Sequence, residues 1–475
     1  MVIDAMTIWY FLFLAFSYGS AYPPASRTWF SKNRLWTSSQ LSSINKLEVD
    51  FRKDDAAVLS LKNGSWVKFI AGASNQDLPL IRNMCYLYTL AGVNCIDMSA
   101  DPAVITVAKE GVNKAMIDLN DPLAQPPLIM ISVNDDDDPH FRKAVFDPVL
   151  CPPECSRPCE KVCPAWAIPP LSTRKIGEGR VSTINQSSDQ RDITATGVLA
   201  DRCYGCGRCV PICPLGLIKT ESYTVSTAAI NDLFASGAVD AIEIHTLRHH
   251  EKSFNELWSN IGDAVLTRAT IISISFPNMG EETIPYLESL QSVIVDCKSW
   301  NNFKGVQIWQ ADGRPMSGDI GRGTAHKSSN LAASVLFDLE RRLLEEQRVL
   351  SSDGNQILID SECRNSNEQY QANPSEIKNS GSHVHLIDVS CGMHFVQLAG
   401  GTNDYSARSA EQEGLLGAVG FGGFAFGGYA RKIIGELLHE LEDSNPGGKV
   451  EDHPIMLGKC LVFARNLVSS VKEVR

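Results

Sequence analysis

A dense group of cysteines constrains this chain more than any other feature, because eight of its fourteen cysteines lie between Cys151 and Cys213. Such crowding indicates metal ligation rather than a disulfide framework spread along the chain. The second half of the group reads C-x2-C-x2-C-x3-C-P and contains Cys203, Cys206, Cys209 and Cys213. Three closely spaced thiolates on a tight loop reach three corners of one cubane iron–sulfur cluster, whereas the fourth cysteine points elsewhere.

The first half of the group is a looser copy of the second. It contains Cys151, Cys155, Cys159 and Cys163 with three residues in each gap, and both halves end in Cys-Pro. The pair resembles the repeat of a bacterial-type two-cluster ferredoxin, in which each run lends its last cysteine to the other cluster. The predicted ligands are Cys203, Cys206, Cys209 and Cys163 for one 4Fe–4S cluster, and Cys151, Cys155, Cys159 and Cys213 for the other.

The wider gaps of the first run leave one ligand assignment open. Cys151 or Cys155 is a candidate weak ligand, so we expect the second cluster to be the more labile and convertible to a 3Fe–4S form. A zinc site is the alternative, but zinc knuckles use C-x2-C pairs separated by a longer gap. Four crowded cysteines in each run favour iron–sulfur clusters.

Outside the cysteines, apolar runs alternate with amphipathic stretches, which predicts a parallel sheet covered by helices. Eight strand candidates indicate a (β/α)8 barrel, with an open doubly wound sheet as the alternative. The predicted strands are Val67–Ala73, Cys95–Ser99, Pro127–Val133, Ala241–Thr246, Thr270–Phe276, Ser292–Cys297, Gly305–Trp309 and His383–Ser390. The predicted helices are Leu78–Leu90, Ala103–Met116, Ala228–Ser236, Phe254–Ile261, Thr283–Leu290, Leu331–Glu346 and Ala430–Leu441.

The cysteine segment interrupts this alternation after the third predicted strand, which indicates an insertion at the carboxyl-terminal rim of the barrel. We expect a presequence at 1–47, the first part of the barrel at 48–147, a two-cluster ferredoxin-like insertion at 148–222 and the rest of the barrel at 223–475. The polar stretch 355–382 is predicted to be a surface excursion.

Polar residues gather where the predicted strands end, and in a (β/α)8 barrel this rim carries the function. They are Asn75, Gln76, Asp77, Ser99, Asp101, Asn134, Glu243, His245, Asp296, Lys298, Asp312, Asp388 and Cys391. The pattern predicts a pocket for a small-molecule ligand beside the clusters. Helix capping is the alternative for some of these residues, since Asp77 directly precedes a predicted helix.

Two glycine-rich stretches are candidates for binding a phosphate. Gly400 and Gly401 follow the apolar segment Phe395–Ala399, and Gly422 and Gly423 come shortly before a predicted helix. Exposed N–H groups at a helix start favour phosphate, so flavin mononucleotide (FMN) is a candidate cofactor. The alternative is tight packing of a loop without a ligand, because the spacing matches no standard phosphate fingerprint.

Composition and the amino terminus bear on partners and location. The net charge of -12 argues against a general nucleic-acid binder, which normally carries a basic face. The apolar run TIWYFLFLAF is short for a membrane span and suits a signal peptide, so no stable membrane insertion is expected. The Ser-rich, acid-free stretch 22–46 is typical of a transit peptide. Such bipartite presequences resemble those of algae with complex plastids, so we expect a plastid location, in the stroma.

The segments GASNQDLP and ADPAV, followed by the two cysteine runs, resemble the light-dependent period (LdpA) iron–sulfur protein family of cyanobacteria and plastid-bearing relatives. The likeness extends from about Phe69 to near the carboxyl terminus and includes GFGGFAFGGYARKI. It implies two clusters and a role in reporting redox or light state to the circadian clock, through a redox partner or signalling protein.

Two other functions remain open from the residues. An iron–sulfur flavoprotein oxidoreductase would pass electrons to a small molecule in the barrel mouth, whereas a cluster carrier would transfer its cluster to another protein. The sequence has no nucleophile–base pair and no H-E-x-x-H motif, so hydrolysis is unsupported. Whether the chain is an enzyme stays open.

Overall fold

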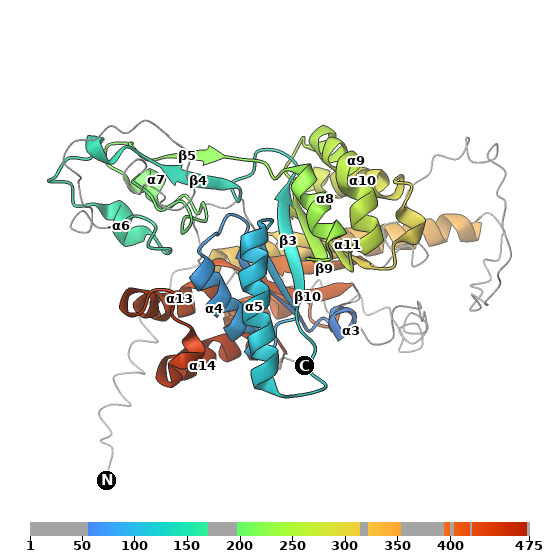
Figure 1. Cartoon of the computed structure of the whole chain (residues 1–475). Coiled ribbons are helices and arrows are strands. Elements are labelled where there is room, and N and C mark those ends of the chain that lie inside the picture. The colour runs from blue at the N-terminus through green and yellow to red at the C-terminus, as the bar shows by residue number, and fades with distance from the viewer. Residues whose placement is uncertain are drawn as a thin grey trace, which may run out of the picture. The chain divides into compact units, whose positions relative to one another are not determined.

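The computed structural model describes residues 56–169, 197–313, 322–352, 394–399, 403–418 and 420–472. Eight parallel strands close into a barrel in the order β1-β2-β3-β6-β7-β8-β9-β10 (Figure 1). The strands are β1 (Trp66–Gly72), β2 (Cys95–Ser99), β3 (Leu128–Asn134), β6 (Ala241–His245), β7 (Ile271–Pro277), β8 (Val306–Asp312), β9 (His394–Ala399) and β10 (Phe421–Phe426). The predicted (β/α)8 barrel is therefore confirmed, and the open doubly wound sheet is wrong.

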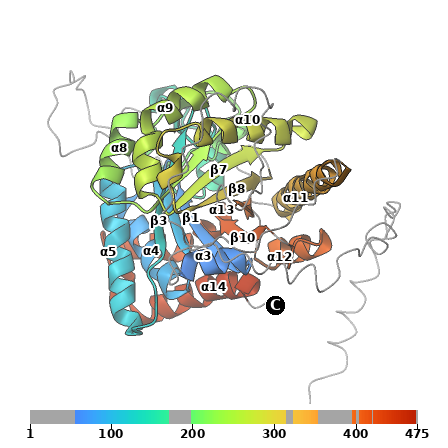
Figure 2. The same cartoon turned by 90° about the vertical axis from the view of Figure 1, so that its right-hand side faces the viewer.

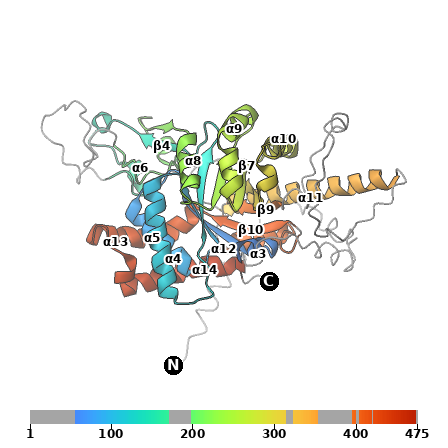
Figure 3. The same cartoon turned by 45° about the vertical axis from the view of Figure 1, so that its right-hand side comes forward.

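Helices follow the strands and cover the outside of the sheet, as Figure 2 shows for α5, α8, α9 and α10. The helices of the barrel are α3 (Ala56–Lys62), α4 (Leu78–Leu90), α5 (Pro102–Leu119), α8 (Thr227–Ala235), α9 (Glu251–Arg268), α10 (Thr283–Val295), α11 (Arg322–Ser352), α12 (Asn403–Gln412), α13 (Gly428–Ser444) and α14 (Pro454–Lys472). Short 3-10 turns are η3 (Gly280–Glu282), η4 (Trp300–Asn302) and η5 (Val450–Asp452). Figure 3 shows α11 extending away from the barrel.

The alternation of side chains along the strands builds two cores. Outward residues such as Val67 and Phe69 pack against the surrounding helices in the larger core. Inward residues at the start of the strands, including Trp66, Met130 and Phe395, form a second apolar cluster inside the barrel with Val58 and Leu61 of α3. The amino-terminal end of the barrel is therefore filled and covered by α3.

The cysteine segment lies between β3 and α8, and its described residues form a small unit, which we call the cysteine unit (residues 142–169 and 197–222). Its elements are β4 (Arg142–Val145), η1 (Pro148–Leu150), α6 (Pro158–Val162), α7 (Cys209–Ile212) and β5 (Lys219–Ser222), and β4 pairs antiparallel with β5. Phe146, Ile168, Val198 and Ile218 pack with the cysteines in a separate hydrophobic cluster. The likeness of this unit to a two-cluster ferredoxin stays a prediction.

The chain leaves the barrel and returns to it beside one residue, Asn134 at the end of β3. The Nδ2 of Asn134 donates to the carbonyl of Tyr223 at 2.9 Å, and its Oδ1 accepts from the N–H of Val225 at 3.2 Å. Both ends of the cysteine unit are therefore fixed at the carboxyl-terminal rim, which we call the barrel mouth.

Several sequence predictions need correction or lie outside the described residues. The predicted strand Ser292–Cys297 is wrong, because residues up to Val295 continue α10, whose buried face contains Leu290 and Ile294. The stretch predicted as a glycine-rich loop before a helix is instead strand β10. The predicted strand His383–Ser390, the presequence 1–47 and the excursion 355–382 lie outside the described residues.

Helix α14 is long and apolar enough to cross a membrane by length and composition alone. It packs against α4, α12 and α13, and its buried side chains include Cys460, Leu467 and Val468. Core packing accounts for only part of its apolar composition, because Ile455, Val462 and Phe463 of this helix are exposed. The absence of stable membrane insertion stays a prediction.

Candidate metal centre

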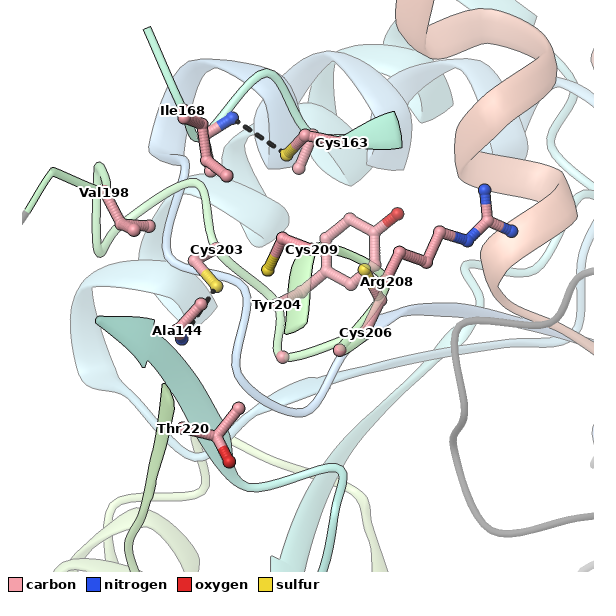
Figure 4. A pocket seen from close by; sticks show the side chains of 14 residues that line it. Ala144, Cys163, Ile168, Val198, Cys203, Tyr204, Cys206, Arg208, Cys209 and Thr220 are labelled. Carbon is pink, nitrogen blue, oxygen red and sulfur yellow. Dashed lines mark hydrogen bonds between the residues drawn. The ribbon is translucent and has the colours of Figure 1, made fainter. Parts of the chain in front are cut away.

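Four cysteines from both runs line one cavity of the cysteine unit (Figure 4). Cys163 follows α6 in the first run, whereas Cys203, Cys206 and Cys209 belong to the second run. We call these four the Cys163 group. The structure brings together the same four cysteines that the spacing pattern assigns to one cluster, although ligation itself is not seen.

Backbone N–H groups point at the sulfurs of the Cys163 group. The N–H of Ala144 donates to Cys203 Sγ at 3.4 Å, and the N–H of Ala167 donates to Cys163 Sγ at 3.3 Å. Figure 4 shows a further N–H, that of Ile168, directed at Cys163. Such donors stabilise negative charge on thiolates and tune the potential of an iron–sulfur cluster.

The remaining cysteines of the two runs form a second group, the Cys213 group, made of Cys151, Cys155, Cys159 and Cys213. Burial raises the pKa of Cys151, Arg157 lowers it, and the thiols of Cys155 and Cys213 raise it again. Burial raises the pKa of Cys159, and the nearby Cys151 thiol raises it further. Arg157 holds this group together, since its N–H donates to Cys155 Sγ at 3.4 Å and its Nη1 to Cys151 Sγ at 3.7 Å.

The two runs end in the same local conformation. Cys163 has φ -76° and ψ 109°, and Cys213 has φ -71° and ψ 113°. Each N–H donates to the carbonyl three residues earlier, at Glu160 and Val210 respectively. Burial alone would raise the pKa of Cys213, but the N–H groups of residues 215–218 lower it below its usual value. The repeat read from the sequence is therefore visible in the backbone.

Two glycines shape the loop of the Cys163 group. Gly205 and Gly207 have φ of +71° and +74°, in the left-handed region that favours glycine. A Cβ at Gly205 would lie 2.4 Å from the carbonyl oxygen of Arg142, and one at Gly207 would lie 2.4 Å from Nη2 of the same arginine. The side chain of Arg142 also donates from Nε to the carbonyl of Gly205 at 2.9 Å. The close approach to the β4 backbone therefore requires glycine at position 205, whereas at position 207 it is the positive φ that favours glycine.

Comparison with known proteins agrees with this site. Residues 151–224 match the family model described as the LdpA Fe-S cluster-binding domain. Residues 233–340 and 382–470 match that of the Light dependent period A C-terminal domain. The chain is 36% identical over 417 residues to Light dependent period A of Synechococcus elongatus, which covers 87% of this chain and 93% of that relative. The chain belongs to the Light dependent period A family. Its membership, with the matched cluster-binding domain, makes it an iron–sulfur protein.

In this LdpA-family chain, hydrogen bonds join the Cys163 group to the end of β1. The Nζ of Lys143 donates to the carbonyls of Ala200 at 2.6 Å and Cys203 at 2.8 Å, and also to that of Ser74. The N–H of Gln76 donates to the carbonyl of Asp201 at 2.9 Å. The loop that carries Cys203 is therefore bonded directly to the barrel.

Helix α13 makes a second contact with the cysteine unit. The guanidinium of Arg431 lies over the ring of Tyr204, and its Nη1 donates to the carbonyl of Ile70 at 2.7 Å. The ring of Trp166 stacks on that of His439 with 4.6 Å between their centres. Because Tyr204 lies between Cys203 and Cys206 in the sequence, Arg431 packs on the loop that carries three cysteines of the Cys163 group.

The inside of the barrel turns polar above the apolar cluster at its base. Lys68 and Glu243 form a fully buried ion pair, and Asp97 Oδ2 lies 3.9 Å from Lys68 Nζ. Glu243 also accepts from Ser273 at 2.9 Å and from Gln310 at 2.7 Å. Burial opposes both charges, yet mutual attraction raises the pKa of Lys68 and lowers that of Glu243.

Sequence reasoning found Glu243 but missed the other polar residues of this interior. Lys68, Asp97, Ser132, Ser273, Gln310 and Gln397 are buried inside the barrel. The sequence pattern that could have revealed these residues is a polar residue at every second position of an otherwise apolar strand, as in the C-I-D-M-S of β2. Such alternation identifies an inward-facing polar layer once the barrel is known.

The predicted rim residues separate into three sets. Asn75, Ser99, Asn134 and His245 are buried at the barrel mouth, and Glu243 is buried below them. Asp312 ends β8 at the mouth, where its Oδ2 lies 3.7 Å from His140 Nε2. Asp77 and Asp101 cap α4 and α5, as the capping alternative predicts, and Gln76 donates to Asp101 at 2.8 Å. Placing Asp296 and Lys298 at the rim was wrong, because they follow the end of α10. Asp388 and Cys391 lie outside the described residues.

Tight packing explains two of the four glycines proposed for a phosphate. Gly422 and Gly423 lie in β10 at the amino-terminal end of the barrel, where Gly423 pairs with Trp66. A Cβ at Gly423 would lie 2.1 Å from the carbonyl oxygen of Trp66, and one at Gly422 would lie 2.8 Å from Leu61 Cδ2. Gly400 and Gly401 lie outside the described residues, and FMN binding stays a prediction.

Proposed function

We propose that the chain binds two 4Fe–4S clusters and reports the redox state of its surroundings to a partner protein. One observation carries this proposal. Cys163 lies with Cys203, Cys206 and Cys209 around one cavity, although forty residues of sequence separate it from Cys203. This exchange leaves Cys213 for the first run and divides eight cysteines into two sets of four, as two cubane clusters require.

The donor sets fit iron–sulfur clusters in their chemistry. Both groups consist of thiols alone, with backbone N–H groups directed at several sulfurs. Two cysteines of the Cys163 group, Cys203 and Cys209, are buried, whereas Cys159 is the one buried cysteine of the Cys213 group. The smaller number of buried cysteines supports a more labile cluster in the Cys213 group, one that converts to a 3Fe–4S form in air.

Through contacts between the cysteine unit and the barrel, a change in cluster charge would alter the surface that a partner binds. When bound, such clusters supply one-electron redox chemistry. Each electron adds a negative charge beside Arg431 and Lys143, which connect the Cys163 group to β1 and α13. Reduction would strengthen attraction across this contact, so a partner that binds here would distinguish the two states.

Cofactor analysis of anaerobically purified chain tests the proposal. Two cubane clusters predict about eight iron and about eight sulfide per chain, with no flavin. Stoichiometric FMN would favour the oxidoreductase, and rapid transfer of iron and sulfide to an apo-ferredoxin would favour a cluster carrier. Zinc, or no metal at all, would exclude cluster binding.

We also propose that the chain acts in the plastid stroma. The support is the composition of residues 1–47, with an apolar run followed by a basic, Ser-rich stretch. A fluorescent protein fused after residue 47 should accumulate in the plastid of an alga with complex plastids. A fusion in which residues 22–46 lose their Arg and Lys should stop before the stroma, and cytosolic fluorescence of the unaltered fusion would refute the proposal.

A further inference from the structure

Two histidines and one aspartate converge at the barrel mouth, outside both cysteine groups. Asp138 and His140 belong to the connection between β3 and β4, and His245 is the last residue of β6. One potential ligand atom from each of the three side chains lies within 4.8 Å of the other two. The rings of His140 and His245 have 4.7 Å between their centres. Two separate segments of the chain thus bring two nitrogen ligands and one oxygen ligand together.

His245 carries a buried ring nitrogen that makes no hydrogen bond within the described residues. Its side chain is 7% exposed, and its Nε2 has no hydrogen bond within the part of the chain that the structure describes. Oε1 of Glu243 lies 3.4 Å away without the geometry of a hydrogen bond. A buried polar group without a hydrogen bond is destabilising, so a ligand that bound this nitrogen would remove that cost.

Asp138 orients the second histidine. Nδ1 of His140 lies 2.7 Å from Oδ1 of Asp138, which also accepts from the backbone N–H of His140 at 2.7 Å. Nε2 of His140 lies 3.7 Å from Oδ2 of Asp312 at the end of β8. Oδ1 of Asp138 thus holds one ring nitrogen of His140, which leaves the other ring nitrogen and the second oxygen of Asp138 for a metal ion.

The surrounding charge favours an added cation. Deeper in the barrel, Lys68 forms an ion pair with Glu243. The carboxylates of Asp138 and Asp312 lie instead beside the histidines. A divalent ion would offset the mutual repulsion of these carboxylates.

We propose that Asp138, His140 and His245 bind a divalent transition-metal ion, with Asp312 as the neighbouring carboxylate. Two imidazoles with a carboxylate suit Zn²⁺, Fe²⁺ or Mn²⁺. Metal–ligand distances of about 2.0–2.2 Å require the ligand atoms, now within 4.8 Å of one another, to come closer by side-chain rotation. Since Asp138 and His140 directly precede β4, the ion fastens the start of the cysteine unit to the barrel.

Mn²⁺ is the probe that separates this site from the cysteine groups, because it prefers oxygen and nitrogen over thiolate ligands. Anaerobic chain with its clusters in place is titrated with MnCl₂ and followed by electron paramagnetic resonance (EPR). We expect one tightly bound Mn²⁺ per chain, with couplings to imidazole ¹⁴N in the pulsed spectrum. Free aqueous Mn²⁺ throughout the titration, or bound Mn²⁺ without imidazole coupling, overturns the proposal.

Matched variants locate the ion. His140→Gln and His245→Asn should each weaken Mn²⁺ binding at least tenfold, whereas His326→Asn on the exposed face of α11 should leave it unchanged. Iron and sulfide content shows whether each variant is folded. If His245→Asn loses its clusters, the Mn²⁺ affinity of His140→Gln tests the proposal instead. The side chain of His140 is 19% exposed, so its substitution should disturb the fold less. Unaltered binding by a variant with full cluster content overturns the proposal.

Discussion

The guanidinium of Arg431 lies 4.3 Å from the centre of the Tyr204 ring, which joins α13 of the barrel to the loop of the Cys163 group. Tyr204 is 8% exposed, so this contact is largely shielded from solvent. A shielded cation interacts with nearby charge more strongly than one in water, because the surrounding dielectric constant is lower. The state of a cluster at the Cys163 group should therefore depend on Arg431.

Removing this cation should lower the reduction potential of one cluster. In Arg431→Met, the reduced cluster loses a favourable charge, and we expect its potential to fall by tens of millivolts. Arg431→Lys, which keeps the charge, should restore most of the difference. The measurement is a redox titration followed by EPR, and equal potentials in wild type and Arg431→Met would contradict the expectation.

Cysteine variants should sort by spatial group rather than by sequence run. Cys163→Ser should lose the same EPR signal as Cys206→Ser, because both cysteines line one cavity. Cys213→Ser should instead match Cys159→Ser. Each should retain about half of the iron, and Cys297→Ser, outside both groups, should retain all of it. If Cys163→Ser matched Cys159→Ser, the exchange of ligands between runs would be wrong.

Alanine substitutions at two glycines distinguish the effect of a steric clash from that of a strained backbone conformation. Gly205→Ala forces a Cβ against the Arg142 carbonyl, whereas Gly216 shares a positive φ of +62° but has open space around it. We expect Gly205→Ala to lose the cluster of the Cys163 group. Gly216→Ala should keep both clusters and lose only about 1 kcal/mol of stability. Iron and sulfide analysis with urea unfolding tests this, and full cluster content in Gly205→Ala would count against it.

A buried ion pair clamps η5 to α4. The side chains of Arg82 and Glu451 are 7% and 8% exposed, and both carboxylate oxygens of Glu451 accept from Arg82. Burial would raise the pKa of Glu451, but the hydrogen bonds and charge of Arg82 lower it overall. A carboxyl with a lowered folded pKa stabilises the protein above its unfolded pKa of about 4.3, and this contribution is lost as pH falls through the folded pKa.

Glu451→Gln should therefore destabilise the barrel by about 3 kcal/mol at neutral pH. The difference from wild type should stay constant between about pH 8 and pH 5, where Glu451 remains charged. The matched control is Glu256→Gln in the exposed Lys252–Glu256 pair, which should change stability by less than about 0.5 kcal/mol. Urea unfolding followed by tryptophan fluorescence measures both, and a difference that shrinks between pH 8 and pH 6 would contradict the assignment.

The barrel was predictable where hydrophobic periodicity agreed with packing. The strands near Val67, Cys95 and Ile131 fall within a residue or two of their predicted bounds, because each is a short apolar run followed by an amphipathic helix. The prediction failed at Ser292–Cys297, where a Val-Ile-Val run has strand propensity but continues an amphipathic helix. Packing of Leu290 and Ile294 against the core outweighs that local preference.

Strand β10 and the polar interior were beyond local pattern reasoning. Glycines are disfavoured in strands, and Gly423 is required only because the backbone of Trp66 passes close to it. That approach depends on barrel closure, which joins residues far apart in the sequence. Likewise, the sequence alone predicts that Lys68 is exposed, because its buried partner Glu243 comes from a distant strand. The cysteine groups were predictable because their chemistry depends on local spacing.

The double hydrogen bond of Asn134 has a consequence for the architecture of the family. Since β3 pairs directly with β6, the barrel wall is complete without the roughly ninety residues between Asn134 and Val225. An ancestral barrel could acquire the cysteine unit by lengthening a single loop, with no strand displaced. Iron–sulfur chemistry is thus an addition to this scaffold, and a deletion that joins Asp135 to Tyr223 through a short turn should yield a folded, colourless barrel.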